Sequence, residues 1–448
     1  MKIEGIIPST FTKGKESNSM RLIDEILRDE NLKEAIKRVK INKGAPGIDK
    51  MTVEEIDEYF NLYKEEIKQS IFEKKYKPQP FKRVYIPKAN GKKRPLGIST
   101  VKDRVIQQAI AQKLSHIYDN QFSENSYGYR PKRSAQDAIT KTLQYLNEGY
   151  EWVIDLDIKA YFDTVNHDKL ISILREDVND STTLHLIRKF LRAGVMENGL
   201  AKANTIGMPQ GGPLSPILSN VLDKFDKELE NRGLRFVRYA DDSNIFVKSE
   251  MAANRVMKSV TSWLERKLFL KVSATKTKVV RPTDSNFLGF TYYKNSTEWK
   301  CRPTQRSKKN LYDKCRKELI RKKCVARPNA ITFKKINQIM RGWINYYRIG
   351  SMKMFITKFG EWVRHKIRVI ILKQWKKPET IYVNLQKLNR KLPYKFSDEK
   401  IYAVANTRLG LYKQANGNVV NFLLNDKILA MKKEERPGLV NPLTYYLG

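Results

Sequence analysis

The sequence has little cysteine and little histidine, and this shortage excludes several kinds of site. Its 448 residues include three cysteines and four histidines. The cysteines, Cys301, Cys315 and Cys324, are too few and too irregularly placed for a disulfide framework or a paired-cysteine zinc site. The histidines lie far apart and form no HExxH-type pair. Metal chemistry must therefore rest on carboxylates, and the cysteines are predicted to be structural thiols.

Long apolar runs are also missing. None approaches the roughly 20 residues that a bilayer crossing needs, and Ile6 and Ile7, which precede Pro8, are too short a patch for a secretory signal. Hydrophobic residues make up 41% and charged residues 30%, the balance of a globular protein. We therefore expect an intracellular, cytoplasmic protein with no membrane partner, long enough to form several domains.

Acidic residues are in deficit. Lys and Arg total 86 against 48 Asp and Glu, a formal net charge of +38. Solubility needs a charge of only about 2–8 for a small domain, so this excess predicts a polyanionic partner, with nucleic acid as the leading candidate. An anionic membrane is a weaker alternative, because the basic residues are spread along the chain instead of forming one cluster.

Periodicity and turn signals predict both helices and strands. Residues 82–98 are expected to form a hairpin around Asn90-Gly91. Helices are predicted over residues 101–118, from Ser134 onward, and through residues 336–347. The hairpin arms carry six cationic residues: Lys82, Arg83, Lys88, Lys92, Lys93 and Arg94.

Carboxylates stand at the ends of predicted strands. A buried strand over residues 152–157 ends at Asp157, and two strands over residues 235–239 and 243–247 flank Asp241 and Asp242. Mg²⁺ prefers hard oxygen ligands, and two ions about 3.5–4 Å apart can activate a 3′-hydroxyl and stabilise a pyrophosphate leaving group. An isolated Asp-Asp pair is more often a solvated turn, but the ordered context of these acids favours a metal site.

Three segments resemble motifs of the reverse transcriptases, in the order in which that family carries them: residues 157–163 (DIKAYFD), 207–216 (GMPQGGPLSP) and 239–242 (YADD). The resemblance implies a polymerase that copies RNA into DNA with dNTPs and two Mg²⁺ ions. By resemblance, Asp157 and Asp241 bind both metals and Asp242 completes the acidic cluster. The backbone carbonyl of Ile158 helps to hold one ion.

The same resemblance suggests residues that contact the nucleotide. Lys88 and Arg94 match the position where the family's fingers fold over the incoming triphosphate, and general attraction to the nucleic-acid backbone is the alternative for each. Gln210 and Gly211 match the loop that packs against nucleotide and template. A glycine there permits close backbone approach.

Two further candidates concern the sugar and the leaving group. Phe162 matches the family's steric gate against a ribose 2′-hydroxyl, with simple core packing as its alternative. Lys276 is a candidate for protonating pyrophosphate, and Lys278 is an equal alternative.

From about Met20 onward, the chain resembles a group II intron-encoded reverse transcriptase and maturase. Residues 42–49 resemble its N-terminal extension, residues 126–131 an early polymerase block, and residues 341–347 the thumb or maturase helix. The implied partners are an RNA template, intron RNA, a DNA primer or target DNA, and dNTPs. Predicted nucleic-acid contacts are Arg83, Arg130, Arg341 and Arg348, whereas Trp343 is predicted to be core.

The implied fold is α+β and shaped as a right hand, with α/β fingers, a palm with an antiparallel sheet, a helical thumb and a small basic C-terminal domain. The expected divisions are a flexible tail at 1–19, an N-terminal extension at 20–80, fingers and palm at 81–298, thumb at 299–392, and a DNA-binding-like domain at 393–448.

Two departures and two alternatives accompany this resemblance. No cysteine- and histidine-rich endonuclease module follows the C-terminal domain, so target cleavage is not expected. The helix over residues 217–226 is one residue shorter than the family's usual run, which would rotate the downstream residues by about 100°. A domesticated reverse transcriptase in antiviral defence, or a non-catalytic RNA-binding splicing chaperone, would share many of these features. The oligomeric state cannot be predicted.

Overall fold

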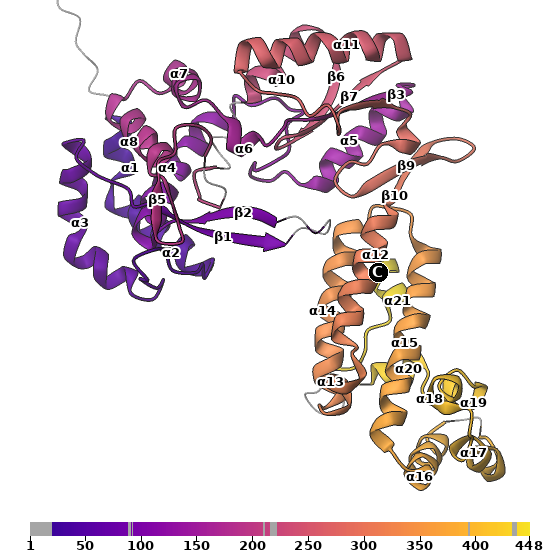
Figure 1. Cartoon of the computed structure of the whole chain (residues 1–448). Helices are drawn as coiled ribbons and strands as arrows, with labels where there is room; N and C mark the ends of the chain where they lie inside the picture. The colour runs from indigo at the N-terminus through magenta and orange to yellow at the C-terminus, as the bar shows by residue number, and fades with distance from the viewer. Residues whose placement is uncertain are drawn as a thin grey trace, which may run out of the picture.

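The computed structural model describes residues 20–87, 91, 93–208, 211–215, 222–392, 395–431 and 437–448. The predicted tail at residues 1–19 and the first half of the predicted helix at 217–226 lie outside them. In Figure 1 the sheets and helices of the first two thirds of the chain lie above and to the left of a column of helices, whose lower end is formed by α16 (Pro378–Asn389) and α17 (Asp398–Ala405). The chain is thus a mixed α and β protein followed by a helical part, as predicted.

The N-terminal part consists of helices packed around a basic hairpin. Strands β1 and β2 pair antiparallel, and β1 also pairs in parallel with β4, giving the sheet order β2-β1-β4-β5. The side chain of Thr100 caps α4 by accepting a hydrogen bond from the Asp103 backbone N–H, so this apolar helix begins where predicted. The elements are α1 (Leu22–Ile26), α2 (Asp29–Ile41), α3 (Ile56–Phe72), β1 (Phe81–Pro87), β2 (Lys93–Ile98), α4 (Val101–Tyr118), α7 (His167–Asp177), α8 (Ser181–Arg192), β4 (Val195–Glu197) and β5 (Leu200–Lys202).

The central sheet is antiparallel, in the order β6-β7-β3-β8. Side chains alternate between its faces: Ile154 and Leu156 enter one core with helix α11, whereas Val153 enters another with helix α5. Helix α5 begins after Ser134, as predicted, and a complete capping box between Ser134 and Asp137 fixes its start. The elements are α5 (Ala135–Asn147), β3 (Trp152–Asp157), α6 (Tyr161–Thr164), α10 (Asp223–Asn231), β6 (Arg235–Tyr239), β7 (Asp242–Val247), α11 (Glu250–Trp263), the π-helix η2 (Leu264–Leu268), β8 (Lys278–Val280) and the 3₁₀ turn η3 (Pro282–Asp284).

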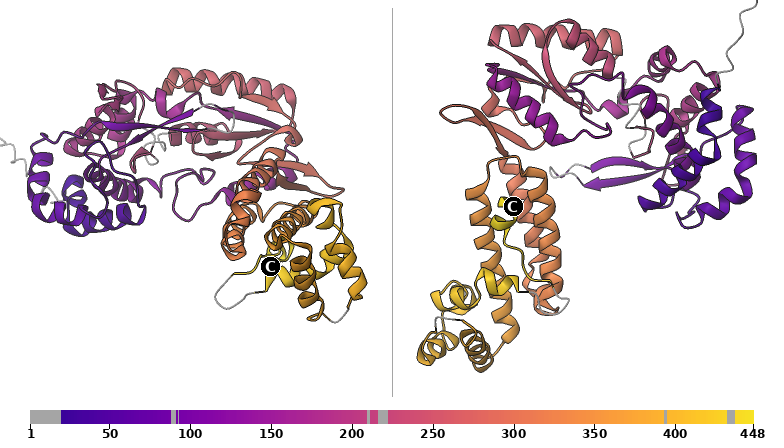
Figure 2. Two further views of the ribbon diagram at one scale, coloured as in Figure 1. Left: turned by 60° about the horizontal axis from the view of Figure 1, so that its bottom comes forward. Right: turned by 180° about the vertical axis from the view of Figure 1, so that it is seen from behind.

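A β-hairpin leads from the sheet into the helical column, and the views in Figure 2 show the column extending away from the sheet. Ile344 and Ile356 of the column share a buried cluster with Phe246 of β7 and Tyr292 of the hairpin, which joins the two parts. The elements are β9 (Phe290–Lys294), β10 (Trp299–Pro303), α12 (Gln305–Glu318), α13 (Arg321–Val325), α14 (Asn329–Tyr347), α15 (Lys353–Trp375), α16 (Pro378–Asn389), α17 (Asp398–Ala405), α18 (Gly410–Gln414), α19 (Asn418–Leu423), α20 (Asp426–Ala430) and α21 (Pro442–Leu447).

The buried clusters cross two of the predicted divisions. One core contains Leu311 and Leu385 on one side of residue 393, and Ile401 and Leu423 on the other. Another runs from Ile23 into the central sheet, across the division at residue 80. The predicted N-terminal extension and C-terminal domain therefore share cores with their neighbours. In the described part of the chain, every helix is too short or too polar to cross a lipid bilayer.

Candidate active site

The three predicted aspartates lie together at one edge of the central sheet. The antiparallel register of β3 with β7 pairs Asp157 with Asp242, and Asp241 lies in the turn between β6 and β7. Ala240 in that turn has a φ of 57°, a left-handed conformation that is uncommon outside glycine. Because strand side chains alternate, Asp157 and Asp242 lie on the face that carries Val153. The structure thus brings together acids that are far apart in the sequence.

The acids affect one another electrostatically. Desolvation, followed by the charges of Asp241 and Asp157, raises the pKa of Asp242 to about 6. Burial, with Asp157 as the largest like charge, raises the pKa of Asp241, and the positive charges of Lys276 and Arg94 oppose that rise. Carboxyl groups whose pKa values are raised by burial and by each other's charges are stabilised in the ionised form by a bound cation, so this site is suited to binding one.

A loop before β8 surrounds Asp157. The Asp157 carbonyl accepts from the Ser273 N–H at 2.8 Å, and the Asp157 N–H donates to the Thr277 Oγ1 at 3.2 Å. Lys276 Nζ then lies 2.7 Å from Asp157 Oδ1. The alternative residue Lys278 instead donates to the Asp284 carbonyl at 3.2 Å. The geometry therefore favours Lys276 over Lys278 as the lysine at the catalytic edge.

A buried ion pair supports the turn that carries Asp241. The Arg238 guanidinium and the Asp226 carboxylate are both fully buried, with an Nη2–Oδ2 distance of 2.5 Å. Arg238 Nη1 also donates to the Ala240 carbonyl at 3.0 Å, and Nη2 to Ser126 Oγ at 2.8 Å. This pair was not predicted from the sequence. The sequence did contain a signal for it: Arg238 lies on the same side of β6 as the apolar Phe236, so its charge could have been expected to be buried. A buried guanidinium needs a buried partner of opposite charge.

The predicted polymerase block at residues 126–131 packs directly on the same turn. A Cβ on Gly128 would lie 2.3 Å from the Ala240 nitrogen, so only glycine fits there. Tyr129 has a φ of 60° and lies close enough to Asp241 that burial and then this charge raise the pKa of its hydroxyl. Tyr129 was not predicted individually as a site residue, although it lies in the predicted block at residues 126–131.

Arg130 is enclosed by the protein, which argues against the predicted nucleic-acid contact. Its side chain is 4% exposed, and its Nε lies 2.9 Å from Asp119 Oδ1. The guanidinium also donates to the carbonyls of Asp119, Ser123 and Ser126. With its donors directed at the protein, Arg130 holds this loop instead of reaching a phosphate.

The segment over residues 207–216 starts beside the Asp157 motif and continues toward the hairpin. Met208 N–H donates to the Phe162 carbonyl at 2.6 Å. Gly211 has a φ of 114°, and a Cβ there would lie 3.0 Å from the Gly97 carbonyl of β2. Phe162 itself is half-buried, packed against the core and edge-on to Tyr161 at 5.3 Å, a position compatible with both of its predicted roles. Gln210 lies outside the described residues.

The predicted contacts on the hairpin and thumb have different surroundings. Arg94 is exposed on β2 and Arg83 is half-buried on β1, while Lys88 lies outside the described residues. Arg341 on α14 and Arg348, the residue after it, are exposed, and their guanidinium carbons lie 5.5 Å and 5.4 Å from the centre of the Tyr445 ring. Both thumb arginines therefore stack on the C-terminal helix α21.

The donor chemistry at this edge fits Mg²⁺, because it consists of carboxylates and a nearby backbone carbonyl at Ile158. Among the described residues, however, no group of three or more His, Cys, Asp or Glu is arranged to hold a metal ion. Lys276 engages one oxygen of Asp157 in the geometry seen. A metal ion at Asp157 would thus use the other carboxylate oxygen, Oδ2, or share Oδ1 with this lysine.

Comparisons with known proteins assign the family. Residues 86–292 match the family described as reverse transcriptase (RNA-dependent DNA polymerase), and residues 308–389 match the group II intron, maturase-specific domain. Protein YkfC of Escherichia coli (strain K12) is 33% identical over 311 residues, covering 60% of this chain and 82% of YkfC. The chain belongs to the reverse transcriptase family. The predicted resemblance is thereby confirmed.

Other relatives of this reverse transcriptase are longer. The group II intron-encoded protein LtrA of Lactococcus lactis subsp. cremoris is 38% identical over 230 residues, or 48% of this chain and 37% of LtrA. A putative COX1/OXI3 intron 2 protein of Saccharomyces cerevisiae is 33% identical over 255 residues, or 56% of this chain and 28% of that protein. A solved partial Cas6-RT-Cas1–Cas2 complex is 26% identical and covers 55% of this chain and 43% of its own, but its TM-score of 0.36 supports no conclusion.

Proposed function

We propose that this reverse transcriptase copies an RNA template into DNA from a DNA primer or target DNA, and binds group II intron RNA to assist its splicing and mobility. The observation that carries the polymerase proposal is the register that pairs Asp157 with Asp242 and places Asp241 in the adjoining turn. All three acids lie within the range that matches the reverse transcriptase family.

Two Mg²⁺ ions, when bound, supply the positive charge that activates the primer 3′-hydroxyl and stabilises the leaving pyrophosphate. Asp157 and Asp241 would hold both ions, with Asp242 and the Ile158 carbonyl completing the ligand set. The raised pKa values of Asp241 and Asp242 support this assignment, because a bound cation offsets both the desolvation and the like charges that raise them.

Other side chains act on the dNTP. Arg94, on the exposed face of β2, neutralises charge on the triphosphate, and its effect on the Asp241 carboxyl supports a position facing the catalytic edge. Lys276 carries a proton 2.7 Å from Asp157 and donates it to the leaving pyrophosphate. The close approach of Gly211 to Gly97 supports a role for this loop against the nucleotide, beneath the hairpin.

Primer extension tests the polymerase proposal. Purified protein, a short RNA template with an annealed DNA primer, dNTPs and Mg²⁺ should give full-length cDNA. Asp241→Asn should abolish the product, because a neutral amide cannot replace an ionised metal ligand. Glu151→Gln is the matched control, since it makes the same chemical change at the opposite, exposed end of β3. The absence of extension by the wild-type protein refutes the polymerase proposal.

A splicing assay tests the maturase proposal separately. The net charge of +38 and the maturase-specific match over residues 308–389 support binding to intron RNA. RNA that co-purifies with the protein identifies the intron to be used. Asp241→Asn should accelerate splicing of that RNA at near-physiological Mg²⁺ as well as the wild type does. Splicing that is unchanged by adding either protein contradicts the maturase role.

A further inference from the structure

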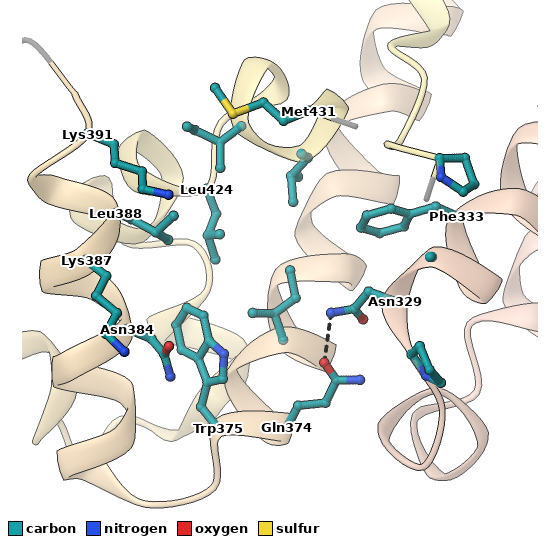
Figure 3. A pocket seen from close by; sticks show the side chains of 16 residues that line it. Asn329, Phe333, Gln374, Trp375, Asn384, Lys387, Leu388, Lys391, Leu424 and Met431 are labelled. Atoms are coloured by element: carbon teal, nitrogen blue, oxygen red, sulfur yellow. Dashed lines mark hydrogen bonds between the residues drawn. The ribbon is translucent and has the colours of Figure 1, made fainter. Parts of the chain in front are cut away.

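A cavity of about 550 Å³ opens between helices α14, α15 and α16 and the C-terminal segments (Figure 3). Helix α16 lies at the far end of the helical column from the catalytic sheet in Figure 1. The volume lies in the roughly 300–1,000 Å³ range of ligand sites. Apolar side chains dominate the lining: Phe333, Ile371, Trp375, Leu388, Leu424 and Met431.

The polar groups of the lining fall into two sets. Gln374 donates to the carbonyls of Cys324 and Arg327 and accepts from Asn329 Nδ2 at 2.9 Å, so this amide is fully used within the protein. Asn384 differs, because its Nδ2 donates to the Thr380 carbonyl at 2.8 Å and this bond fixes the orientation of the amide. Among the described residues, Asn384 Oδ1 has no hydrogen-bond donor, which leaves an oriented acceptor on the wall beside Trp375. Asn329 Oδ1 is a second lining acceptor without a donor, and it is buried.

Two cations mark the rim of the cavity. Lys387 lies in the last turn of α16 and Lys391 in the turn that follows the helix, and both line the cavity together with Leu388. Both are exposed, and no carboxylate among the described residues forms a salt bridge with either of them. A matching occupant carries negative charge outside the cavity and a flat apolar group inside. An apolar peptide segment satisfies only the second requirement.

We propose that the cavity binds one unstacked base of a single-stranded RNA, with adjacent phosphates on Lys387 and Lys391. The base stacks on Trp375, and its amino or imino N–H donates to Asn384 Oδ1. The choice of RNA as the occupant rests on the proposed maturase function. It is supported by the position of the cavity, since most lining residues before Leu424 fall within residues 308–389, which match the maturase-specific domain. Base binding itself is independent of polymerisation at the palm.

The test uses a short single-stranded RNA with one central 2-aminopurine, whose fluorescence reports stacking. The wild type should quench it, and a duplex of the same sequence should compete poorly, because its bases are paired. Trp375→Leu should weaken binding about 5- to 150-fold, the loss expected for one stacked base. Trp375→Phe should restore most of the affinity by returning an aromatic face.

A lysine pair provides a second test that does not disturb the core. Lys387→Gln with Lys391→Gln should weaken binding and flatten its salt dependence by about 1.4 in the log–log slope, as expected for two lost phosphate contacts. Lys400→Gln with Lys413→Gln removes the same charge from exposed positions outside the cavity, and should have a smaller effect. Primer extension on a short template should be unchanged in all four variants, because the cavity is independent of the palm. If the wild type fails to extend a primer, that result refutes the polymerase proposal and leaves the proposal for the cavity standing.

The proposal is overturned by any of three results. The first is wild-type affinity in Trp375→Leu or in the double lysine variant. The second is equal competition by duplex RNA. The third is tighter binding of the same sequence as single-stranded DNA, which overturns the assignment to RNA.

Discussion

Asp226→Asn leaves the Arg238 guanidinium buried without its counter-charge. Both side chains are 0% exposed, and the carboxylate accepts from Nε at 2.7 Å and from Nη2 at 2.5 Å. Removing one partner of such a pair costs about 3–5 kcal/mol. This is a large part of the roughly 5–15 kcal/mol that stabilises a folded domain. Urea unfolding of the variant should therefore show a clearly lower midpoint.

The pair also has a positioning role, which a double variant separates from its contribution to stability. Arg238→Met with Asp226→Leu replaces both charges with apolar groups and should recover most of the stability. It does not replace the 3.0 Å hydrogen bond from Arg238 to the Ala240 carbonyl, which fixes the turn before Asp241. Loss of that bond should lower kcat for primer extension about ten- to hundredfold, with little change in the KM for dNTP.

A second ion pair provides the control. Arg232→Met with Glu228→Leu removes a more exposed ion pair and should change the unfolding free energy by less than about 1 kcal/mol. If the Asp226→Asn variant unfolds at the wild-type urea concentration, the inferred cost of the buried charge is wrong. If the double apolar variant has wild-type kcat, Arg238 does not position the catalytic turn.

Three further predictions concern other parts of the site. Phe162→Ala should lower the preference for dNTPs over NTPs in kcat/KM, by up to about a hundredfold if the ring is a steric gate; an unchanged preference assigns Phe162 to core packing. The pKa of Asp242 is raised to about 6 from an ordinary 3.8, so the folded state binds more protons between these values. The unfolding free energy of the metal-free protein should thus fall as pH rises from 4 to 6. The fall should amount to only about 1 kcal/mol, because the side chain of Asp242 is exposed and solvent screens its charge. The fall should be absent in Asp242→Asn. Arg130→Ala should lower the unfolding free energy by about 2–3 kcal/mol, because it leaves backbone carbonyls without donors. The salt dependence of RNA binding should be unchanged in this variant. A shallower salt dependence would instead identify Arg130 as a phosphate contact.

Local chemistry in the sequence determined most of the elements. The apolar run over residues 152–157 could be recognised as a strand because β-formers dominate it. Helices α4 and α5 begin at side-chain caps that depend on residues three apart. The motifs around Asp157 and Asp241 led to the predicted family, because they occur along the chain in the same order as in reverse transcriptases. The shortage of cysteine and histidine also predicted that any metal ligands would be carboxylates.

Tertiary structure alone decided which charged residues face solvent and which are enclosed. Arg130 and Arg94 are alike in the sequence, yet one is enclosed by carbonyls and the other is exposed near Asp241. Arg238 and Asp226 meet only because α10 packs against β6, and the cavity beside Trp375 exists only where three helices and the C-terminal segments converge. These features depend on contacts between residues distant in the chain, and no local pattern specifies such contacts.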